Sequence, residues 1–289
     1  MPCPRLPLCL RHVNPSFSPP DICNYYDAYC NEFGLFRHIE FNTVCVAADV
    51  GATHADGSCC KWRVRTQPNS AERSSGVAEQ TREFDALFIC TGQFWAPKLP
   101  TLPPRWREEF SGNVLHSSRY RNAVALAGRD VCIVGIGNSA LDIALEAARA
   151  GARVSIVCRA GTTIIPVADD TGRPVDEVLL SRFFQSGLPR AARQLWFYLL
   201  TAGTNSDFRA AGLPEPAPGA TAQFSNLKEH RLFREMLASG RIRLRSGRLS
   251  AMAGRTLTFA GADGSGGEAF SLPCDDLICA TGAGSAAPS

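Results

Sequence analysis

Apolar residues in the middle of the chain follow the pattern of a strand, a helix and a second strand. Residues 130–135 (DVCIVG) form a short apolar run, and residues 138–150 place apolar side chains at helical spacing. Gly151 is placed to end that helix, and residues 153–158 (RVSIVC) form a second apolar run. This order and length predict two parallel strands joined by a right-handed crossover helix.

The flanking sequence predicts further short elements. A helix is expected over residues 21–33, and another over residues 226–239, each followed by a glycine that can end it. Residues 195–200 (LWFYLL) are predicted to lie in a buried helix, since so short a run cannot span a bilayer. Strands are expected where apolar residues alternate or run on, at 38–46, 61–66, 84–90, 241–245, 256–259 and 275–280.

Proline-rich stretches interrupt this pattern twice. Residues 1–20 are proline-rich and unpatterned, and we expect them to be disordered. Residues 95–104 (WAPKLPTLPP) are a proline-rich connection, which is typical of a domain boundary.

Composition excludes several classes of protein. A hydrophobic fraction of 45% and a charged fraction of 20% are ordinary for a globular protein. The net charge of +3, with Lys and Arg scattered, argues against a nucleic-acid partner. The 12 cysteines include no CxxC pair, so neither a zinc ribbon nor a dithiol redox centre has its usual spacing. Reduced cysteines behaving as small hydrophobes, at positions such as Cys90, Cys132, Cys158 and Cys279, favour a cytoplasmic protein. No apolar run is long enough to predict a membrane segment in this sequence.

The turn between the first strand and the helix, residues 135–140 (GIGNSA), has the pattern of a phosphate-binding loop. Gly135 allows a tight turn, and Gly137 lets the backbone approach a pyrophosphate. Ala140 stands where a third glycine packs the helix against the strand. Asn138 and Ser139 occupy positions that favour helix capping, so backbone N–H groups and the helix dipole would face the phosphates. The alternative is a glycine-containing turn that binds no ligand.

The residue after the second strand bears on which dinucleotide would bind. An Asp or Glu there would accept a hydrogen bond from the ribose 2′-hydroxyl of NAD, but the strand ends at Cys158 and Arg159. An arginine suits the 2′-phosphate of NADP. The sequence therefore favours NADP, and the alternative for Arg159 is a solvated charge.

Residues 110–121 (FSGNVLHSSRYR) resemble, at every specified position, the FxGxxxHxxx(Y/F)(K/R) signature of the flavin-containing monooxygenases. Three shorter segments are similar to that family and follow in the same order. They are residues 91–97 (TGQFWAP), 172–176 (GRPVD) and 275–282 (DDLICATG). The resemblance covers about residues 21 to 283. Tyr120 stands where the related Baeyer–Villiger oxygenases carry Trp, which indicates the heteroatom-oxidising branch.

The resemblance implies an α/β fold with two dinucleotide-binding domains, in which a doubly wound NADP domain is inserted into an incomplete FAD domain. Residues 1–104 would be the partial FAD domain, residues 105–282 the NADP domain, and residues 283–289 the start of the return. Thr91 and Gly92 would mark the exit from the FAD domain, and Thr281 and Gly282 the return to it. The list of implied cofactor-binding residues also includes His116, Ser117 and Tyr120, in the segment that links the domains and adjusts as NADPH binds.

By the same resemblance, the chain would belong to an NADPH- and FAD-dependent monooxygenase. Such an enzyme uses O2 to form a flavin C4a-hydroperoxide, which oxygenates soft nucleophilic nitrogen or sulfur of small amines and sulfides. The flavin does this chemistry, so no catalytic side chain is expected. Some relatives associate with the endoplasmic reticulum.

Two alternatives remain open. Residues 1–134 contain no second GxGxxG, and the sequence stops soon after Thr281 and Gly282, so relative to the family we expect truncation at both ends. The chain could then be a module that binds NADP without FAD and without turnover. A pyridine-nucleotide disulfide reductase is disfavoured, because the redox cysteine pair is absent.

Overall fold

The computed structural model describes residues 19–53, 59–69, 79–92, 94, 96–167, 174–179, 181–215, 224–227, 230–261 and 268–284. The chain divides into two compact units, Met1–Thr91 and Gly92–Ser289, and each is described by itself. Of the twenty residues expected to be disordered, 1–18 lie outside the described part, while Pro19 and Pro20 begin a helix.

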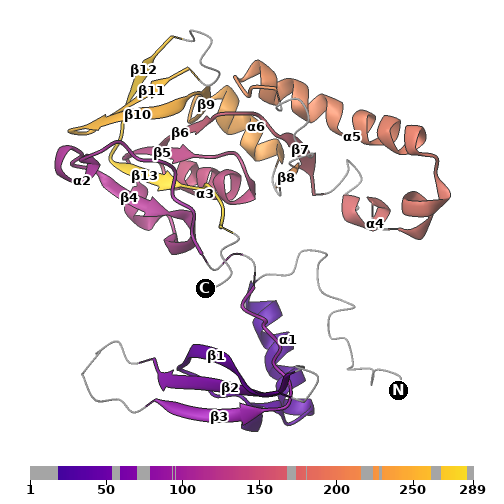
Figure 1. Ribbon diagram of the computed structural model, residues 1–289. Coiled ribbons are helices and arrows are strands. Elements are labelled where there is room, and N and C mark those ends of the chain that lie inside the picture. Colours follow the sequence, from indigo (N-terminus) through magenta and orange to yellow (C-terminus); the bar gives the residue numbers. More distant parts are fainter. Residues whose placement is uncertain are drawn as a thin grey trace. The chain divides into compact units, whose positions relative to one another are not determined.

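The first unit joins a helix to a three-stranded antiparallel sheet (Figure 1). Helix α1 ends before Gly34, whose φ of 59° is left-handed, so the predicted helix is confirmed. The strand expected at 38–46 was placed too early, because a 3-10 turn and Asn42, with φ 53°, precede it. The elements are α1 (Pro19–Glu32), η2 (Leu35–His38), β1 (Thr43–Thr53), β2 (Cys59–Pro68) and β3 (Gln80–Phe84), and the sheet order is β1-β2-β3.

The strand predicted at residues 84–90 is wrong for most of its length. Strand β3 ends at Phe84, and residues 85–90 carry no strand. The side chains of Phe88 and Ile89 are 84% and 73% exposed, and Cys90 is exposed as well. An apolar run becomes a strand only when a neighbouring strand pairs with its backbone, and no described segment does so here.

The second unit is built on a five-stranded parallel sheet (Figure 1). Helix α3 (Asn138–Arg149) connects β5 to β6, which confirms the strand–helix–strand prediction. The strands predicted at 241–245 and 275–280 are also confirmed and lie within this sheet. The strand predicted at 256–259 is confirmed too, but it belongs to a separate antiparallel sheet. Its strands, in spatial order, are β4 (Asn113–His116), β13 (Asp276–Cys279), β5 (Asp130–Val134), β6 (Arg153–Cys158) and β9 (Ile242–Ser246).

The two faces of this sheet are covered differently. Helices α3, α5 (Arg190–Ala210) and α6 (His230–Ala238) pack on one face, where Ile133 and Phe233 are fully buried. A small antiparallel sheet of β10 (Arg248–Ala253), β11 (Thr256–Ala260) and β12 (Phe270–Pro273) covers the other, around Phe259 and Leu277. The parallel sheet is thus the middle of three layers, as buried parallel strands require. The short elements are α2 (Trp106–Glu109), η3 (Ser117–Arg119), η4 (Val124–Leu126), β7 (Thr163–Pro166), α4 (Val175–Leu179), η5 (Phe183–Gly187) and β8 (Phe224–Leu227).

Two helix predictions need correction in this unit. The helix expected over 226–239 begins only at His230, because Phe224–Leu227 forms a strand parallel to β7. Residues 195–200 are helical, but Leu195 and Leu199 are 60% and 66% exposed, so the prediction of a buried helix is wrong. Consecutive residues point to all sides of a helix, and only one stripe of α5 faces the core.

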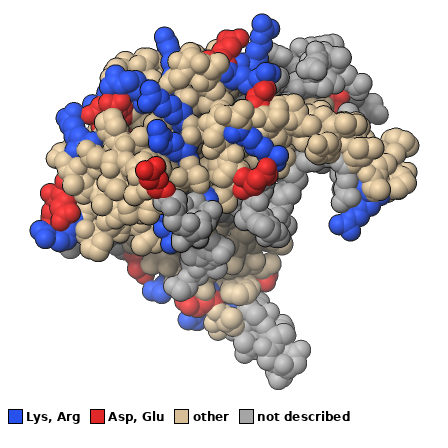
Figure 2. Space-filling view, turned by 90° about the horizontal axis from the view of Figure 1, so that it is seen from above, with Lys and Arg blue, Asp and Glu red and all other residues tan. Residues whose placement is uncertain are grey.

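Within the described part, no helix is both long and apolar enough to cross a bilayer. Lys and Arg side chains lie interspersed with Asp and Glu on the face seen in Figure 2.

Candidate dinucleotide-binding site

The phosphate loop leaves the sheet at Gly135, directly after β5. Its N–H donates to Val157 O of β6 at 2.9 Å, and its φ of 123° is left-handed. A Cβ atom at this position would lie 2.3 Å from Ala280 O, beyond the end of β13. Only glycine fits, because two neighbouring strands close tightly around this turn.

Gly137 begins helix α3 as its N-cap residue. Its backbone is extended, with φ −76° and ψ 179°, and its carbonyl accepts from the N–H groups of Ala140 and Leu141. A Cβ atom here would meet nothing within 4 Å. The open space at the start of a 12-residue helix is a fit for a pyrophosphate, which would benefit from the helix dipole.

The other loop residues divide into exposed and buried positions. Asn138 and Ser139 are exposed in the first turn of α3, and neither is the N-cap residue, so their expected capping position is corrected by one residue. Ala140 is fully buried in the core between α3 and the sheet. A larger side chain there would push the helix away from the strand, as the fingerprint implies.

Arg159 follows β6 and is exposed at the same edge of the sheet as the loop. Among the described residues it makes no hydrogen bond or ion pair. The carbonyl of the preceding Cys158 accepts from Gly247 N–H at 3.0 Å, which joins the ends of β6 and β9. Burial raises the pKa of the Cys158 thiol to about 11, so this cysteine stays protonated and packs as a hydrophobe.

His116 ties the end of β4 to the segment after β13. The ring is buried, and Nδ1 accepts from the Ser118 N–H at 3.1 Å. In a neutral ring the proton is then on Nε2, which donates to Gly282 O at 3.1 Å. Ser117 begins the short helix η3 beside it. His116 therefore fixes the backbone at the edge where the phosphate loop lies.

The side chain of Tyr120 does not lie at the phosphate loop. Its ring packs against the helical side of the core, and its hydroxyl is buried without a hydrogen-bond partner among the described residues. Burial, and next the carboxylate of Glu146, raise the pKa of this phenol. Glu146 is in the last turn of α3, whereas the phosphate loop leads into the first turn. The structure therefore does not bring the Tyr120 hydroxyl to the loop.

Residues 96–98 and 281–284, near the two ends of the second unit, run side by side. Thr281 donates from its hydroxyl to Lys98 O, and Lys98 N–H donates to Gly282 O at 3.0 Å. Gly284 N–H donates to Ala96 O at 2.8 Å, and Pro97 pairs antiparallel with Ala283. These contacts hold the two ends of the second unit next to each other.

The remaining predicted site residues, and two residues that were not predicted, are placed as follows. Thr91 is the last residue of the first unit and Gly92 the first residue of the second, so the predicted Thr-Gly pair lies at the division between the units. Of the segment 172–176, residues 172 and 173 lie outside the described part, and Val175 begins α4. Lys98 and Ala280 contact site residues but were not predicted, since a single sequence carries no signal for contacts across such separations.

The fold and this edge are typical of a dinucleotide-binding domain of the kind found in two-domain flavoproteins. A family model described as flavin-binding monooxygenase-like matches residues 9–208, more than half of the chain. The chain belongs to this family.

Curated relatives are similar over part of their length. Dimethylaniline monooxygenase 2 (N-oxide-forming) of Oryctolagus cuniculus is 31% identical over 172 residues, which are 58% of this chain and 30% of that protein. Flavin-containing monooxygenase 2 of Homo sapiens is 30% identical over 174 residues, 59% of this chain and 31% of that protein. The chain thus spans about 30% of the length of the curated relatives it matches.

A solved structure supports the fold. The OTEMO complex with FAD and NADP has a TM-score of 0.62 at 15% identity, and the likeness covers 92% of this chain and 57% of that one. At this identity the likeness shows the fold alone. It confirms the predicted two-dinucleotide-binding flavoprotein fold.

Proposed function

We propose that this chain supplies the NADP-binding part of an NADPH- and FAD-dependent monooxygenase. The enzyme would use O2 to oxygenate nucleophilic nitrogen or sulfur of small molecules. The observation that carries the proposal is the phosphate loop, with Gly135 closed against Ala280 and Gly137 opening onto free space. Membership of the flavin-binding monooxygenase-like family supports the type of reaction.

In this proposal the residues at this edge of the sheet have defined tasks toward NADP. The start of α3 would receive the pyrophosphate, with Asn138 and Ser139 exposed beside it. Arg159 would pair with the 2′-phosphate, whose two negative charges suit a guanidinium. His116 would position the chain by holding Gly282 near the same edge.

FAD poses a separate question. When bound, this cofactor accepts a hydride from NADPH and activates oxygen. The described residues present one phosphate loop, at 135–140, and we assign it to NADP. Thr91, Gly92, Thr281 and Gly282 remain our proposed backbone contacts to the cofactors, but they supply no second pyrophosphate site. The presence of one loop favours the alternative that this chain alone binds NADP without FAD and without turnover.

Titration with nucleotides tests the NADP assignment. By isothermal titration calorimetry, we expect Arg159→Gln to weaken NADP+ about tenfold and leave NAD+ unchanged, because only NADP+ carries the 2′-phosphate. Arg231→Gln, which removes an exposed charge from α6, is the matched control. Equal losses for NADP+ and NAD+ would contradict the role of Arg159.

A visible spectrum of the purified chain separates the enzyme from the module. A flavin band that bleaches with NADPH, together with NADPH consumption on adding N,N-dimethylaniline in air, supports the monooxygenase. A colourless protein that still binds NADP+ supports the module. A protein that binds neither cofactor overturns both.

A further inference from the structure

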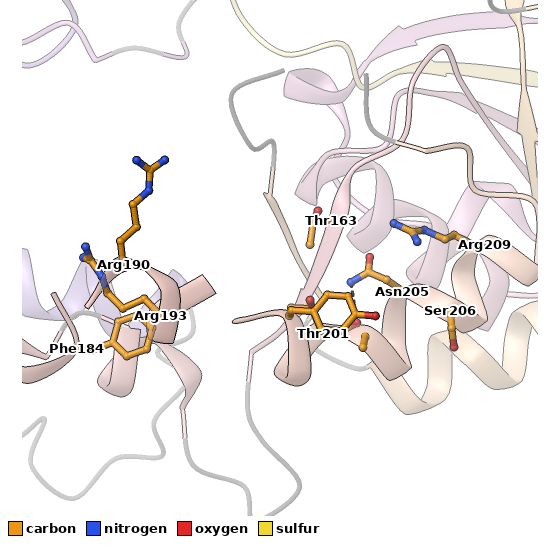
Figure 3. A pocket seen from close by; sticks show the side chains of 10 residues that line it. Thr163, Phe184, Arg190, Arg193, Thr201, Asn205, Ser206 and Arg209 are labelled. Carbon is orange, nitrogen blue, oxygen red and sulfur yellow. Dashed lines mark hydrogen bonds between the residues drawn. The ribbon is translucent and has the colours of Figure 1, made fainter. Parts of the chain in front are cut away.

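The side chain of Asn205, on α5, is buried and makes three hydrogen bonds to backbone groups. It accepts from Ile164 N–H at 2.9 Å, and it donates to Ile164 O at 3.1 Å and to Thr201 O at 2.8 Å. Asn205 and Thr163, the first residue of β7, both line a groove along α5 (Figure 3). Strand β7 pairs with β8, and the Asn205 carboxamide binds both polar groups of Ile164 as the backbone of a further strand would.

The end of α5 that carries Asn205 is fixed to the core of the second unit. Phe208 is fully buried, and its ring stacks on the ring of Phe233, on α6, with 5.3 Å between the centroids. Gly212 follows the helix with a left-handed φ of 102°, and a Cβ atom there would lie 2.8 Å from Leu244 O of β9. Asn205 therefore binds β7 from a support that is packed against the parallel sheet.

The segment that follows Arg159 is held against the residues that follow α5. Gly161 N–H donates to Glu215 O at 3.1 Å. A Cβ atom on Gly161 would lie 1.7 Å from Pro214 O, so only glycine fits where these two backbones meet. Thr162, the next residue, is 3% exposed. The backbone between β6 and β7 is thus part of the packed interior.

Arg159 is one of two exposed residues in the connection from β6 to β7, the other being residue 160. Before this pair, the Gly247 N–H donates to the last residue of β6 at 3.0 Å. After it, Asn205 holds the fully buried Ile164. The direction in which the Arg159 side chain leaves the edge of the sheet therefore depends on how the backbone is held at both ends.

We propose that Asn205 is a positioning residue for NADP, which orients Arg159 toward the 2′-phosphate by fixing β7. The inference rests on the proposed function, in which Arg159 pairs with that phosphate. A guanidinium binds a phosphate through parallel N–H···O bonds whose geometry is demanding, so a shift of the backbone that carries it weakens the pair. Selectivity between NADP and NAD then depends on α5, although α5 contributes no residue to the phosphate loop.

The test compares NADP+ and NAD+ on the full chain by isothermal titration calorimetry. Asn205→Leu keeps the approximate size of the side chain and removes its hydrogen bonds. We expect it to weaken NADP+ about fivefold and to change NAD+ by less than about twofold. NAD+ uses the same phosphate loop without the 2′-phosphate, so its unchanged binding shows that the variant is folded. The control Leu257→Val changes the core on the other face of the sheet, and we expect it to leave the ratio of the two affinities unchanged.

A double variant separates positioning from general stability. In Arg159→Gln the guanidinium is already absent, so we expect the further change Asn205→Leu to weaken NADP+ by less than about twofold. If Asn205→Leu does not fold, Asn205→Asp is the second variant. It keeps the shape of the side chain and the acceptor for Ile164 N–H, but it loses both donated hydrogen bonds. The same selective loss of NADP+ is expected for it.

Two sets of results overturn the inference. If the parent chain does not bind NADP+, or if Arg159→Gln binds it as tightly as the parent, the proposed function fails and the inference fails with it. If Arg159→Gln shows the selective loss, three results overturn the positioning role alone. They are equal losses of NADP+ and NAD+ in Asn205→Leu, NADP+ binding unchanged from the parent, and a loss of NADP+ that persists undiminished in the double variant.

Discussion

The two units of the chain use their apolar side chains in different ways. In Gly92–Ser289, two clusters of buried residues fill the spaces on both faces of the parallel sheet. In the first unit, Val64 is the single buried residue among the side chains that the structure describes. Its valines on β1, at positions 44, 46 and 50, are all exposed. One unit therefore has a hydrophobic core, and the other has mainly backbone pairing.

This difference has a consequence for stability. Burial of apolar surface is the main favourable contribution to folding, whereas exposed ion pairs contribute little. The first unit has exposed pairs such as Arg82 with Glu40 and Lys61 with Asp85. We therefore expect the second unit, which also carries the phosphate loop, to account for most of the cooperative stability of the chain.

The largest expected effect comes from a matched pair of truncations. Leu277, on β13, is fully buried, and we expect Leu277→Ala to lower the free energy of unfolding by about 2–5 kcal/mol. Val44, on β1, is 39% exposed, and we expect Val44→Ala to cost less than about 0.5 kcal/mol. Urea denaturation followed by circular dichroism measures both. Equal losses would show that apolar packing in the first unit contributes as much to the free energy of unfolding as the core of the second unit does.

A smaller effect separates stability from binding within the phosphate loop. Gly135→Ala forces a Cβ against Ala280 O at a left-handed φ, so we expect a loss of about 2–3 kcal/mol. Gly137→Ala meets open space at an ordinary φ, so we expect a smaller loss of at most about 1 kcal/mol, the usual cost of alanine at an N-cap.

The binding of Gly137→Ala decides the function of the loop. Its methyl group would occupy the space of the pyrophosphate, and we expect NADP+ affinity to fall about tenfold or more. Thermal denaturation and calorimetry on the two variants give the comparison. A Gly137→Ala protein that binds NADP+ as tightly as the parent would remove the loop from the nucleotide site.

Local patterns explain which parts of the fold could be predicted. Strand β5, helix α3 and strand β6 are adjacent in sequence. Their periodicity and the glycines of the turn were therefore enough to predict this part of the fold. The strand prediction was wrong for residues 85–90, because a strand also requires a neighbouring strand that pairs with its backbone. The prediction that residues 195–200 are buried was wrong for Leu195 and Leu199, because consecutive apolar residues on a helix cannot all face one core.

The residues of the candidate site also fall into a local group that the sequence predicts and a set of long-range contacts that it does not. The loop residues and Arg159 belong to one local motif, and the structure places them at one edge. The contacts of His116 with Gly282 and of Gly135 with Ala280 join distant parts of the chain. They follow from the position of β13 between β4 and β5, which no single-sequence pattern reveals.

The smallest effect concerns the pH dependence of the second unit. Asp275 lies just before β13, with 17% of its side chain exposed, and accepts from Asp130 N–H at 3.0 Å and from Arg255 at 2.7 Å. The Asp130 N–H, and to a lesser degree Arg255, lower the pKa of this carboxyl below its ordinary value of 3.8. A lowered folded-state pKa means that the contribution is complete above the unfolded pKa and is lost as pH falls through the folded one.

We therefore expect Asp275→Asn to cost about 1 kcal/mol at neutral pH, and the gap to the parent to close as pH falls below 3.8. Urea denaturation over a pH series measures this gap. Glu40→Gln is the control from the first unit, since its exposed pair with Arg82 should give no measurable change at neutral pH. A gap for Asp275→Asn that is independent of pH would show that shape, rather than charge, holds the start of β13. A larger loss for Glu40→Gln would reverse the contrast between the two units, because an exposed ion pair would then stabilise the chain more than a partly buried one.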